Sequence, residues 1–262
     1  MNGSDIHRIP TEFSVISTQP AEQARKLSQS LSDVSIAFFS MPMIRTEAYP
    51  LDAAILKTLK NLNSYRWLIF TSKNGVTSFF QLLTEAGLSF PENLKTAVIG
   101  NTTESALKKH LKKVDFINPG QTSIEFMAAF TSEILLKDEK VLFVLGNLAP
   151  KHMQQELNKI VKTDRLDTYQ TLGIAEYNES IMQKIWDNRY DLLVFTSPSA
   201  FSNFYKYYQI KKSNIPLRIV SIGPITTQAI LKFAPARIIT VKEAGLSGLK
   251  KEIIHSFKNK KT

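Results

Sequence analysis

The chain has 262 residues, 43% of them hydrophobic and 21% charged, which is enough to bury one large core or two smaller ones and excludes a disordered chain. The absence of cysteine excludes disulfides, thiolate metal sites and a cysteine nucleophile. A formal net charge of +10 favours an anionic partner, either a nucleic acid or a small polyanion, unless the lysine clusters are only solvated helix ends.

Apolar runs of strand length alternate with amphipathic segments along the whole chain. Strands are predicted at 13–17, 36–39, 67–70, 96–99, 115–117, 141–145, 191–195, 218–222 and 237–241. Helices are predicted at 21–31, 52–62 with Asp52 as its cap, 75–86, 102–111, 124–136, 150–161, 181–188, 199–208, 226–233 and 246–257. Strands of continuous Ile, Leu, Val and Phe that alternate with helices indicate an α/β fold, with parallel sheets covered on both faces.

A block of these elements occurs twice. The stretch "WLIFTSKNGVTSFF" from Trp67 aligns with "LLVFTSPSAFSNFY" from Leu192, and "KTAVIGNTTESAL" from Lys95 aligns with "RIVSIGPITTQAI" from Arg218. A further strand and helix follow in each copy. We therefore predict duplicated βα units that form two domains.

The second copy has too few strands of its own, and the start of the chain can supply them. We expect residues 1–43 and 176–262 to form a discontinuous first domain and residues 51–162 a second domain. The segments 44–50 and 163–175 are β-prone and lack helical periodicity. They are predicted to be linker strands that pair as a two-stranded hinge.

Hydroxyl residues and glycines follow the matched strands of both copies. In open parallel sheets, ligands bind at the carboxyl ends of the strands, where helix N-termini present unpaired N–H groups. Plain helix capping is the alternative for any single Ser or Thr. The candidates for binding an anion are Ser72, Asn74, Gly100 and Thr103 in one copy, and Ser197, Ser199, Gly223, Thr226 and Thr227 in the other.

Conventional catalytic machinery is not evident in the sequence. There is no Walker loop, no dinucleotide fingerprint and no serine elbow, and the four histidines have no metal-ligand spacing, so no metal site is predicted. Asp164, Asp167 and Glu47 are interpreted as solvated loop charges. Tyr169 in the return linker is a candidate proton donor, with an aromatic wedge in the hinge as the alternative.

The paired "FTSKNGV" and "FTSPSA" turns, the paired "IGNTT" and "IGPITT" turns and the linker "TYQT" together resemble the uroporphyrinogen-III synthase family, from about Phe13 to Phe257. The resemblance implies two flavodoxin-like domains joined by a two-stranded linker. It implies that hydroxymethylbilane loses water, closes to a macrocycle and has ring D inverted, without a cofactor. Tyr169 matches the linker tyrosine of the family, and the hydroxyl and glycine residues above match its substrate-binding turns.

Two positions depart from the pattern of that family. In Thr18-Gln19-Pro20, Gln19 stands where the family usually has the arginine of a Thr-Arg-Pro run. The segment "LGNLAPK" stands where the family usually has an arginine-containing loop, and Lys151 is the nearest cation. A non-catalytic two-domain sensor or binding protein for an anionic ligand therefore stays open as an alternative.

The expected partner is a small polycarboxylate, because the chain lacks a basic helix with interleaved aromatic residues that would favour nucleic acid. No signal-peptide core and no apolar run of about 18 residues is present. We expect a cytoplasmic monomer without membrane contact.

Overall fold

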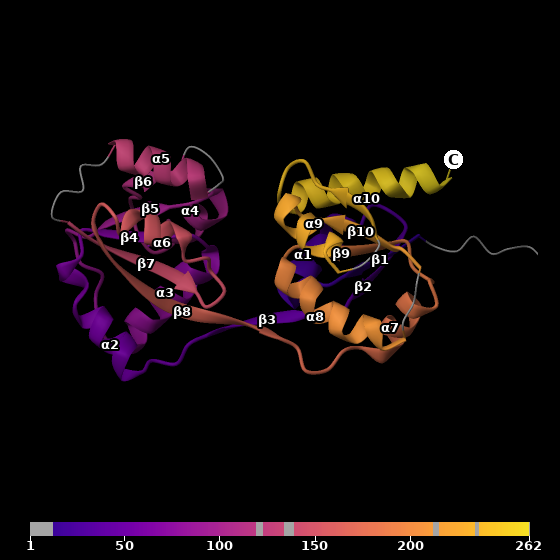
Figure 1. The fold of residues 1–262 in the computed structure, drawn as a ribbon, viewed down its shortest axis with the longest axis horizontal. Helices are drawn as coiled ribbons and strands as arrows, with labels where there is room; N and C mark the ends of the chain where they lie inside the picture. The colour runs from indigo at the N-terminus through magenta and orange to yellow at the C-terminus, as the bar shows by residue number, and fades with distance from the viewer. Residues whose placement is uncertain (1–12, 119–122, 134–138, 212–214, 234–235, 262) are drawn as a thin grey trace, which may run out of the picture. The chain divides into compact units, whose positions relative to one another are not determined.

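The structure is a computed structural model that describes residues 13–118, 123–133, 139–211, 215–233 and 236–261 (Figure 1). The predicted helix at 124–136 ends at residues outside this described part. The chain divides into two compact units, Met1–Arg45 with Leu172–Thr262 and Thr46–Thr171. Within the described ranges, no helix is both long enough and apolar enough to cross a membrane.

The first unit contains a parallel sheet with helices on both faces. Its strand order is β11 (Ala236–Thr240), β10 (Leu217–Ser221), β9 (Leu192–Phe195), β1 (Phe13–Ser17) and β2 (Ile36–Ser40). Its helices are α1 (Ala21–Ser30), α7 (Glu179–Trp186), α8 (Pro198–Tyr208), the short 3-10 helix η2 (Gln209–Lys211), α9 (Pro224–Leu231) and α10 (Leu246–Lys261).

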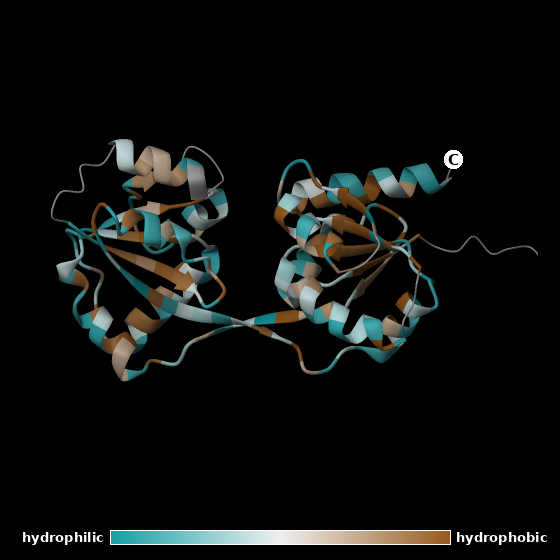
Figure 2. Ribbon diagram, viewed as in Figure 1, coloured by the Kyte–Doolittle hydropathy of each residue, from teal (hydrophilic) through white to brown (hydrophobic). Residues whose placement is uncertain are grey.

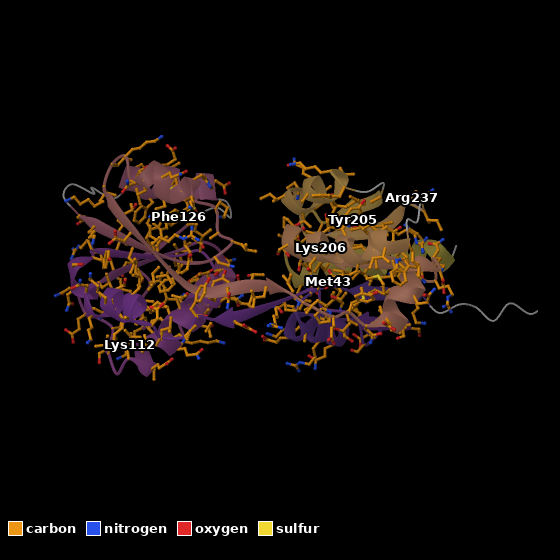
Figure 3. The ribbon with its side chains drawn as sticks, turned by 60° about the horizontal axis from the view of Figure 1, so that its bottom comes forward. Met43, Lys112, Phe126, Tyr205, Lys206 and Arg237 are labelled. Atoms are coloured by element: carbon orange, nitrogen blue, oxygen red, sulfur yellow. The ribbon has the colours of Figure 1, made fainter. Side chains whose placement is uncertain are left out.

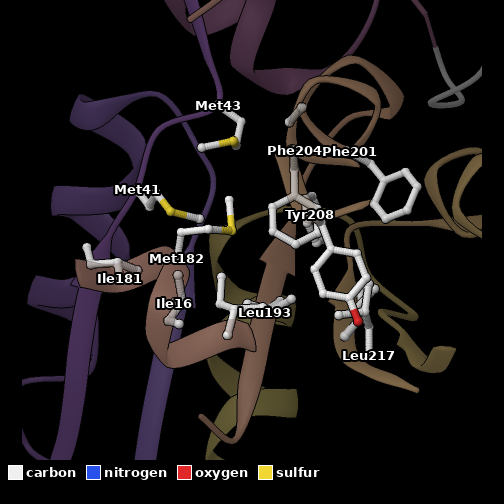
Figure 4. Packing of buried hydrophobic residues seen from close by; sticks show 14 of the residues in the cluster. Ile16, Met41, Met43, Ile181, Met182, Leu193, Phe201, Phe204, Tyr208 and Leu217 are labelled. Carbon is white, nitrogen blue, oxygen red and sulfur yellow. The ribbon is translucent and has the colours of Figure 1, made fainter. Parts of the chain in front are cut away.

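Neighbouring residues of each central strand enter different cores, because side chains alternate across a sheet. Val194 packs with Leu27 and Leu249 on one face. Phe195 packs on the other face with Phe201 and Phe204. Figure 4 shows Met41, Met43 and Met182 gathered in this second core. The fold class predicted from the continuous apolar strands is therefore confirmed.

The second unit has the sheet order β3 (Ile44–Ala48), β8 (Lys162–Gly173), β7 (Lys140–Gly146), β4 (Trp67–Phe70), β5 (Lys95–Val98) and β6 (Phe116–Ile117). Its helices are α2 (Ala53–Lys60), the 3-10 helix η1 (Leu62–Ser64), α3 (Lys73–Glu85), α4 (Asn101–Leu107), α5 (Ser123–Glu133) and α6 (His152–Leu157). Phe126 of α5, labelled in Figure 3, lies in the core on one face of this sheet. Figure 2 shows that hydrophobic residues concentrate on the strands.

Local signals explain where the helices begin, and α4 and α6 end several residues before their predicted ends. Asp52 Oδ1 accepts the Ile55 N–H at 2.7 Å, so the predicted cap of α2 is confirmed. Helices α4 and α6 end at Leu107 and Leu157, and the residues after each continue only as hydrogen-bonded turns.

The predicted return linker forms most of one long strand. β8 pairs in parallel with β7 from Lys162 opposite Lys140 onwards, and the register shifts between Leu145 and Gly146. The shift places Tyr169 opposite Gly146. The chain therefore delivers the candidate proton donor to the carboxyl end of β7, where the parallel strands β4 and β5 also end.

Candidate active site

The two "FTS" turns have the same geometry. Ser72 and Ser197 have φ/ψ of −155°/151° and −158°/152°, and each caps the helix that follows it. Ser72 Oγ accepts the Gly75 N–H and Ser197 Oγ accepts the Ala200 N–H, both at 3.1 Å. Both serines are therefore helix caps, and each side chain satisfies a backbone N–H in the first turn of the helix that follows.

The second contact of each capping serine distinguishes the two turns. Ser72 Oγ lies 3.1 Å from the hydroxyl of Tyr169, whereas Ser197 Oγ lies 3.0 Å from Ser199 Oγ. Because the Ser72 oxygen already accepts one N–H, its own proton is available to Tyr169. Asn74 is half-buried and has no side-chain hydrogen bond with the described residues.

Tyr169 is seated against the backbone of β7. A Cβ atom added at Gly146 would lie 2.6 Å from Tyr169 Cε2, so the ring fits only because residue 146 has no side chain. The Tyr169 carbonyl accepts the Asn147 N–H at 3.1 Å. Asn147 Oδ1 in turn accepts the Thr171 N–H at 2.9 Å. The strand and the loop after β7 thus hold the phenol in place.

Arg165 fixes the same loop, a role that the sequence analysis missed. Its Nη2 donates to the Gly146 carbonyl at 2.9 Å, and its Nη1 donates to the Ala149 carbonyl at 3.1 Å. Its Nε donates to Asp167 Oδ1 at 2.8 Å. Asp167, which the sequence indicates to be a solvated loop charge, is instead the partner that orients this guanidinium. The i, i+2 spacing, which puts both side chains on one face of a strand, was the available signal.

Asp164 is also part of a structural cluster rather than a free charge. It accepts hydrogen bonds from the Tyr65 hydroxyl and from Lys140 Nζ, both at 2.6 Å. Burial and the bond to Asp164 raise the pKa of Tyr65. Burial alone would raise the pKa of Asp164, but the bonds from Lys140 and Tyr65 lower it. Tyr65 precedes β4 and Lys140 begins β7, so this cluster lies at the amino ends of the strands, away from Tyr169.

The two glycine turns differ in backbone conformation. Gly100 has φ 80°, which favours glycine, whereas Gly223 has φ 169°, an extended conformation open to any residue. In the described part of the chain no side chain caps α4 or α9, and a Cβ at either glycine would meet nothing within 4 Å. The first N–H groups of α9 are therefore less enclosed than those of α3 and α8.

The threonines that follow these glycines differ in their side-chain hydrogen bonds. Thr103 and Thr226 are 2% and 3% exposed, and their hydroxyls have no hydrogen bond with the described residues. Thr227 Oγ1 contacts the hydroxyls of Ser221 and Thr240 and donates to the Gly223 carbonyl at 3.2 Å. Thr227 thus ties the end of β10 to β11 and α9 through its side chain.

Comparison with known proteins identifies the family. Residues 25–250 match the family model described as uroporphyrinogen-III synthase HemD. The chain belongs to the uroporphyrinogen-III synthase family. Membership makes the chain an enzyme of tetrapyrrole biosynthesis, a cyclising lyase, and confirms the resemblance found in the paired turns.

Individual proteins extend this match over most of the chain. The porphyrin biosynthesis protein HemD of Ruminiclostridium josui is 26% identical over 234 residues, which cover 87% of this chain and 45% of that one. The uroporphyrinogen-III synthase of Chlorobaculum parvum is 25% identical over 83% of this chain and 88% of its own. A crystal structure of a mutant uroporphyrinogen III synthase from Thermus thermophilus has a TM-score of 0.67 at 12% identity, and the alignment covers 94% of this chain and 99% of that one. This last likeness concerns the fold.

Proposed function

We propose that the chain converts hydroxymethylbilane to uroporphyrinogen III and that Tyr169 donates the proton that lets the hydroxyl group leave. The hydrogen-bonded pair of Tyr169 and Ser72 at the carboxyl ends of the strands supports this role. Proton donation turns the leaving hydroxyl into water as its C–O bond breaks. The terminal pyrrole then attacks through a spiro intermediate, and the proton that it loses restores the phenol. The net change is the loss of one water molecule.

Ser72 is proposed to assist this step without contacting the reacting carbon. Its oxygen accepts the Gly75 N–H and lies 3.1 Å from the Tyr169 oxygen, and we assign the Ser72 O–H as the donor of that contact. In that orientation the phenolic proton of Tyr169 is left for the substrate, and the phenolate that forms has a hydrogen-bond donor beside it. Catalysis would then depend on orientation and electrostatics, because closure of the macrocycle is the chemistry of the substrate itself.

Carboxylate recognition is proposed at the strand ends of each unit. Gly223 and the buried Thr226 open α9 with N–H groups that no side chain of the described residues caps. Gly100 and Thr103 begin α4 in the same way, and Asn74, Ser197 and Ser199 stand in the first turns of α3 and α8. Helix N-termini favour anions, and the net charge of +10 attracts a polycarboxylate. Thr227 would act through its carbonyl-bound hydroxyl by fixing this turn rather than by contacting substrate.

The setting that we propose is a cytoplasmic monomer that acts on a small polycarboxylate and not on nucleic acid. The absence of cysteine and of a basic helix with interleaved aromatic residues supports it. Gel filtration at several concentrations tests the monomer, and a salt-dependent shift with duplex DNA would count against a small-molecule partner alone.

The deciding assay is the isomer ratio. Purified protein is supplied continuously with hydroxymethylbilane, and the porphyrinogens are oxidised and separated. We expect isomer III to predominate with protein present and isomer I without it. Isomer I alone at every protein concentration would overturn the proposal.

A non-catalytic binding protein of the same fold is the second candidate. Gln19 replaces the expected arginine, is only 6% exposed, and accepts a hydrogen bond from the Ser17 hydroxyl at 3.1 Å. An uncharged amide there removes one carboxylate-binding cation. Tight binding of uroporphyrinogen III without any shift in isomer ratio would favour this second candidate.

A further inference from the structure

A small pocket opens at the carboxyl ends of the strands in the second unit. Its volume is about 180 Å³, and its walls come from the ends of β4, β5 and β7 and from the first turn of α6. The walls include the apolar side chains of Ile99, Phe143, Leu145 and Met153, and the polar side chains include Thr71 and Gln154. The pocket is therefore mostly apolar with a few hydrogen-bonding groups, as ligand sites commonly are.

Two residues that line the pocket are sequence neighbours of residues that contact Tyr169. Thr71 directly precedes Ser72, and Leu145 directly precedes Gly146, against which the Tyr169 ring packs. Consecutive residues of a strand face opposite sides of the sheet. Leu145 therefore lines the pocket on one face, and Gly146 contacts the Tyr169 ring on the other. A molecule held in the pocket would lie at the same carboxyl ends of the strands as Tyr169, but on the other face of the sheet.

The wall of the pocket is a fixed part of the fold. Ala149 lines it, and the Ala149 carbonyl is bound by Arg165, whose side chain is only 16% exposed. Phe143 and Leu145 are 0% and 4% exposed, and Met153 is 7% exposed, so the base of the pocket belongs to a packed core. The shape of the pocket does not depend on an unsupported surface loop.

Size and lining together suggest the occupant. An engineered apolar cavity of about 150 Å³ in another protein binds benzene, so a pocket of about 180 Å³ accommodates a single aromatic ring. The Thr71 hydroxyl and the Gln154 amide can bond an N–H or a polar ring substituent. The lining thus fits one polar aromatic heterocycle and is too small for a macrocycle.

We propose that this pocket binds one pyrrole ring of the substrate. This assignment rests on the proposed function. It adds an apolar ring subsite to the anion-binding turns at the carboxyl ends of the strands. The remaining rings and their carboxylates stay outside the pocket.

Methyl NMR on the full chain tests the pocket directly. The chain has six methionines, and among the described ones Met153 alone lines the pocket, so ¹³C-methyl labelling gives one reporter and internal controls such as Met41 and Met182. Pyrrole alone is titrated first, and acetate alone is titrated as the control. We expect a ring-current shift at Met153 with pyrrole and none with acetate. No shift at Met153 at the solubility limit of pyrrole overturns the proposal.

Filling the pocket gives the second readout. Ala149→Leu projects a larger side chain from the loop after β7, and Ile99→Phe enlarges a lining residue after β5 if the first variant does not fold. We expect loss of the Met153 shift and at least a tenfold rise in KM for hydroxymethylbilane. Ile160→Ala, which changes an exposed residue beyond α6, should match the wild type.

The NMR titration and the kinetic measurements distinguish a failure of the pocket assignment from a failure of the enzyme assignment. Wild-type protein that makes isomer III while the filled variants keep the wild-type KM overturns the pocket assignment and leaves the enzyme assignment standing. Wild-type protein that makes only isomer I overturns the enzyme assignment. In that case a Met153 shift with pyrrole supports a ring-binding pocket, and its absence rejects the pocket as well.

Discussion

The hydroxyl of Ser72 lies 3.1 Å from that of Tyr169, and the same serine caps α3 through the Gly75 N–H. One oxygen atom therefore joins a helix start to the candidate proton donor. The matching serine in the first unit, Ser197, has no tyrosine beside it and contacts Ser199 instead. This asymmetry between two similarly capped turns fits the proposed function, in which the second unit carries the proton donor and the first unit binds carboxylates.

Removing the phenolic hydroxyl should reduce turnover specifically. We expect Tyr169→Phe to lower kcat about 100-fold, since a positioned proton donor contributes roughly 10²–10⁴-fold, with little change in the affinity for uroporphyrinogen III. Tyr65→Phe is the matched control, because it removes a hydroxyl that bonds Asp164 at the other end of the sheet. Single-turnover kinetics and product binding separate the effects. An unchanged kcat in Tyr169→Phe would remove the residue from proton transfer.

Alanine substitutions of the two capping serines should distinguish an effect on stability from an effect on activity. Ser72→Ala and Ser197→Ala each lose an N-cap, and each should lower the free energy of unfolding by about 1 kcal/mol. Only Ser72→Ala also loses the contact with Tyr169, so only that variant should lower kcat beyond the effect of stability. Urea unfolding and the isomer assay on both variants check this. Equal activity of the two variants would contradict the role of Ser72.

We expect activity to require glycine at position 146, because the Tyr169 ring packs directly against it. A Cβ there would lie 2.6 Å from Tyr169 Cε2, so Gly146→Ala must displace the phenol or the strand, and we expect kcat to fall at least as far as in Tyr169→Phe. Gly173→Ala is the control. Its Cβ would lie 2.5 Å from Asn203 Oδ1 and should destabilise the first unit without displacing Tyr169. A fully active Gly146→Ala variant would show that the ring is not confined there.

Repeated local patterns made much of this arrangement predictable. The doubled "FTS" turns predicted the starts of α3 and α8, because capping by Ser72 and Ser197 depends on a few neighbouring residues. The partner of Tyr169 was not predictable, since it depends on the register shift that places β8 opposite Gly146. The Arg165 contacts with the Gly146 and Ala149 carbonyls are similarly long-range. Sequence spacing alone carries no information on such backbone acceptors.

The matched glycines should respond differently to alanine. Gly100 has φ 80° and ψ 149°, a region essentially restricted to glycine that costs other residues about 1–3 kcal/mol, so Gly100→Ala should lower the free energy of unfolding by that amount. Gly223 has φ 169° and open space around it, so Gly223→Ala should be nearly neutral in stability. Urea denaturation of both variants measures the difference. Equal losses would contradict the distinction between the two turns.

The His110 ring should make stability depend on pH. It stacks on Phe80 with centroids 4.2 Å apart, and burial together with the charge of Lys109 lowers the pKa of His110 from 6.5. The folded state therefore binds this proton less readily than the unfolded state, so the free energy of unfolding falls as pH drops below 6.5. His110→Gln should reduce the difference in stability between about pH 5.5 and about pH 7.5. The same difference in both proteins, measured by urea unfolding, would exclude His110 as its source.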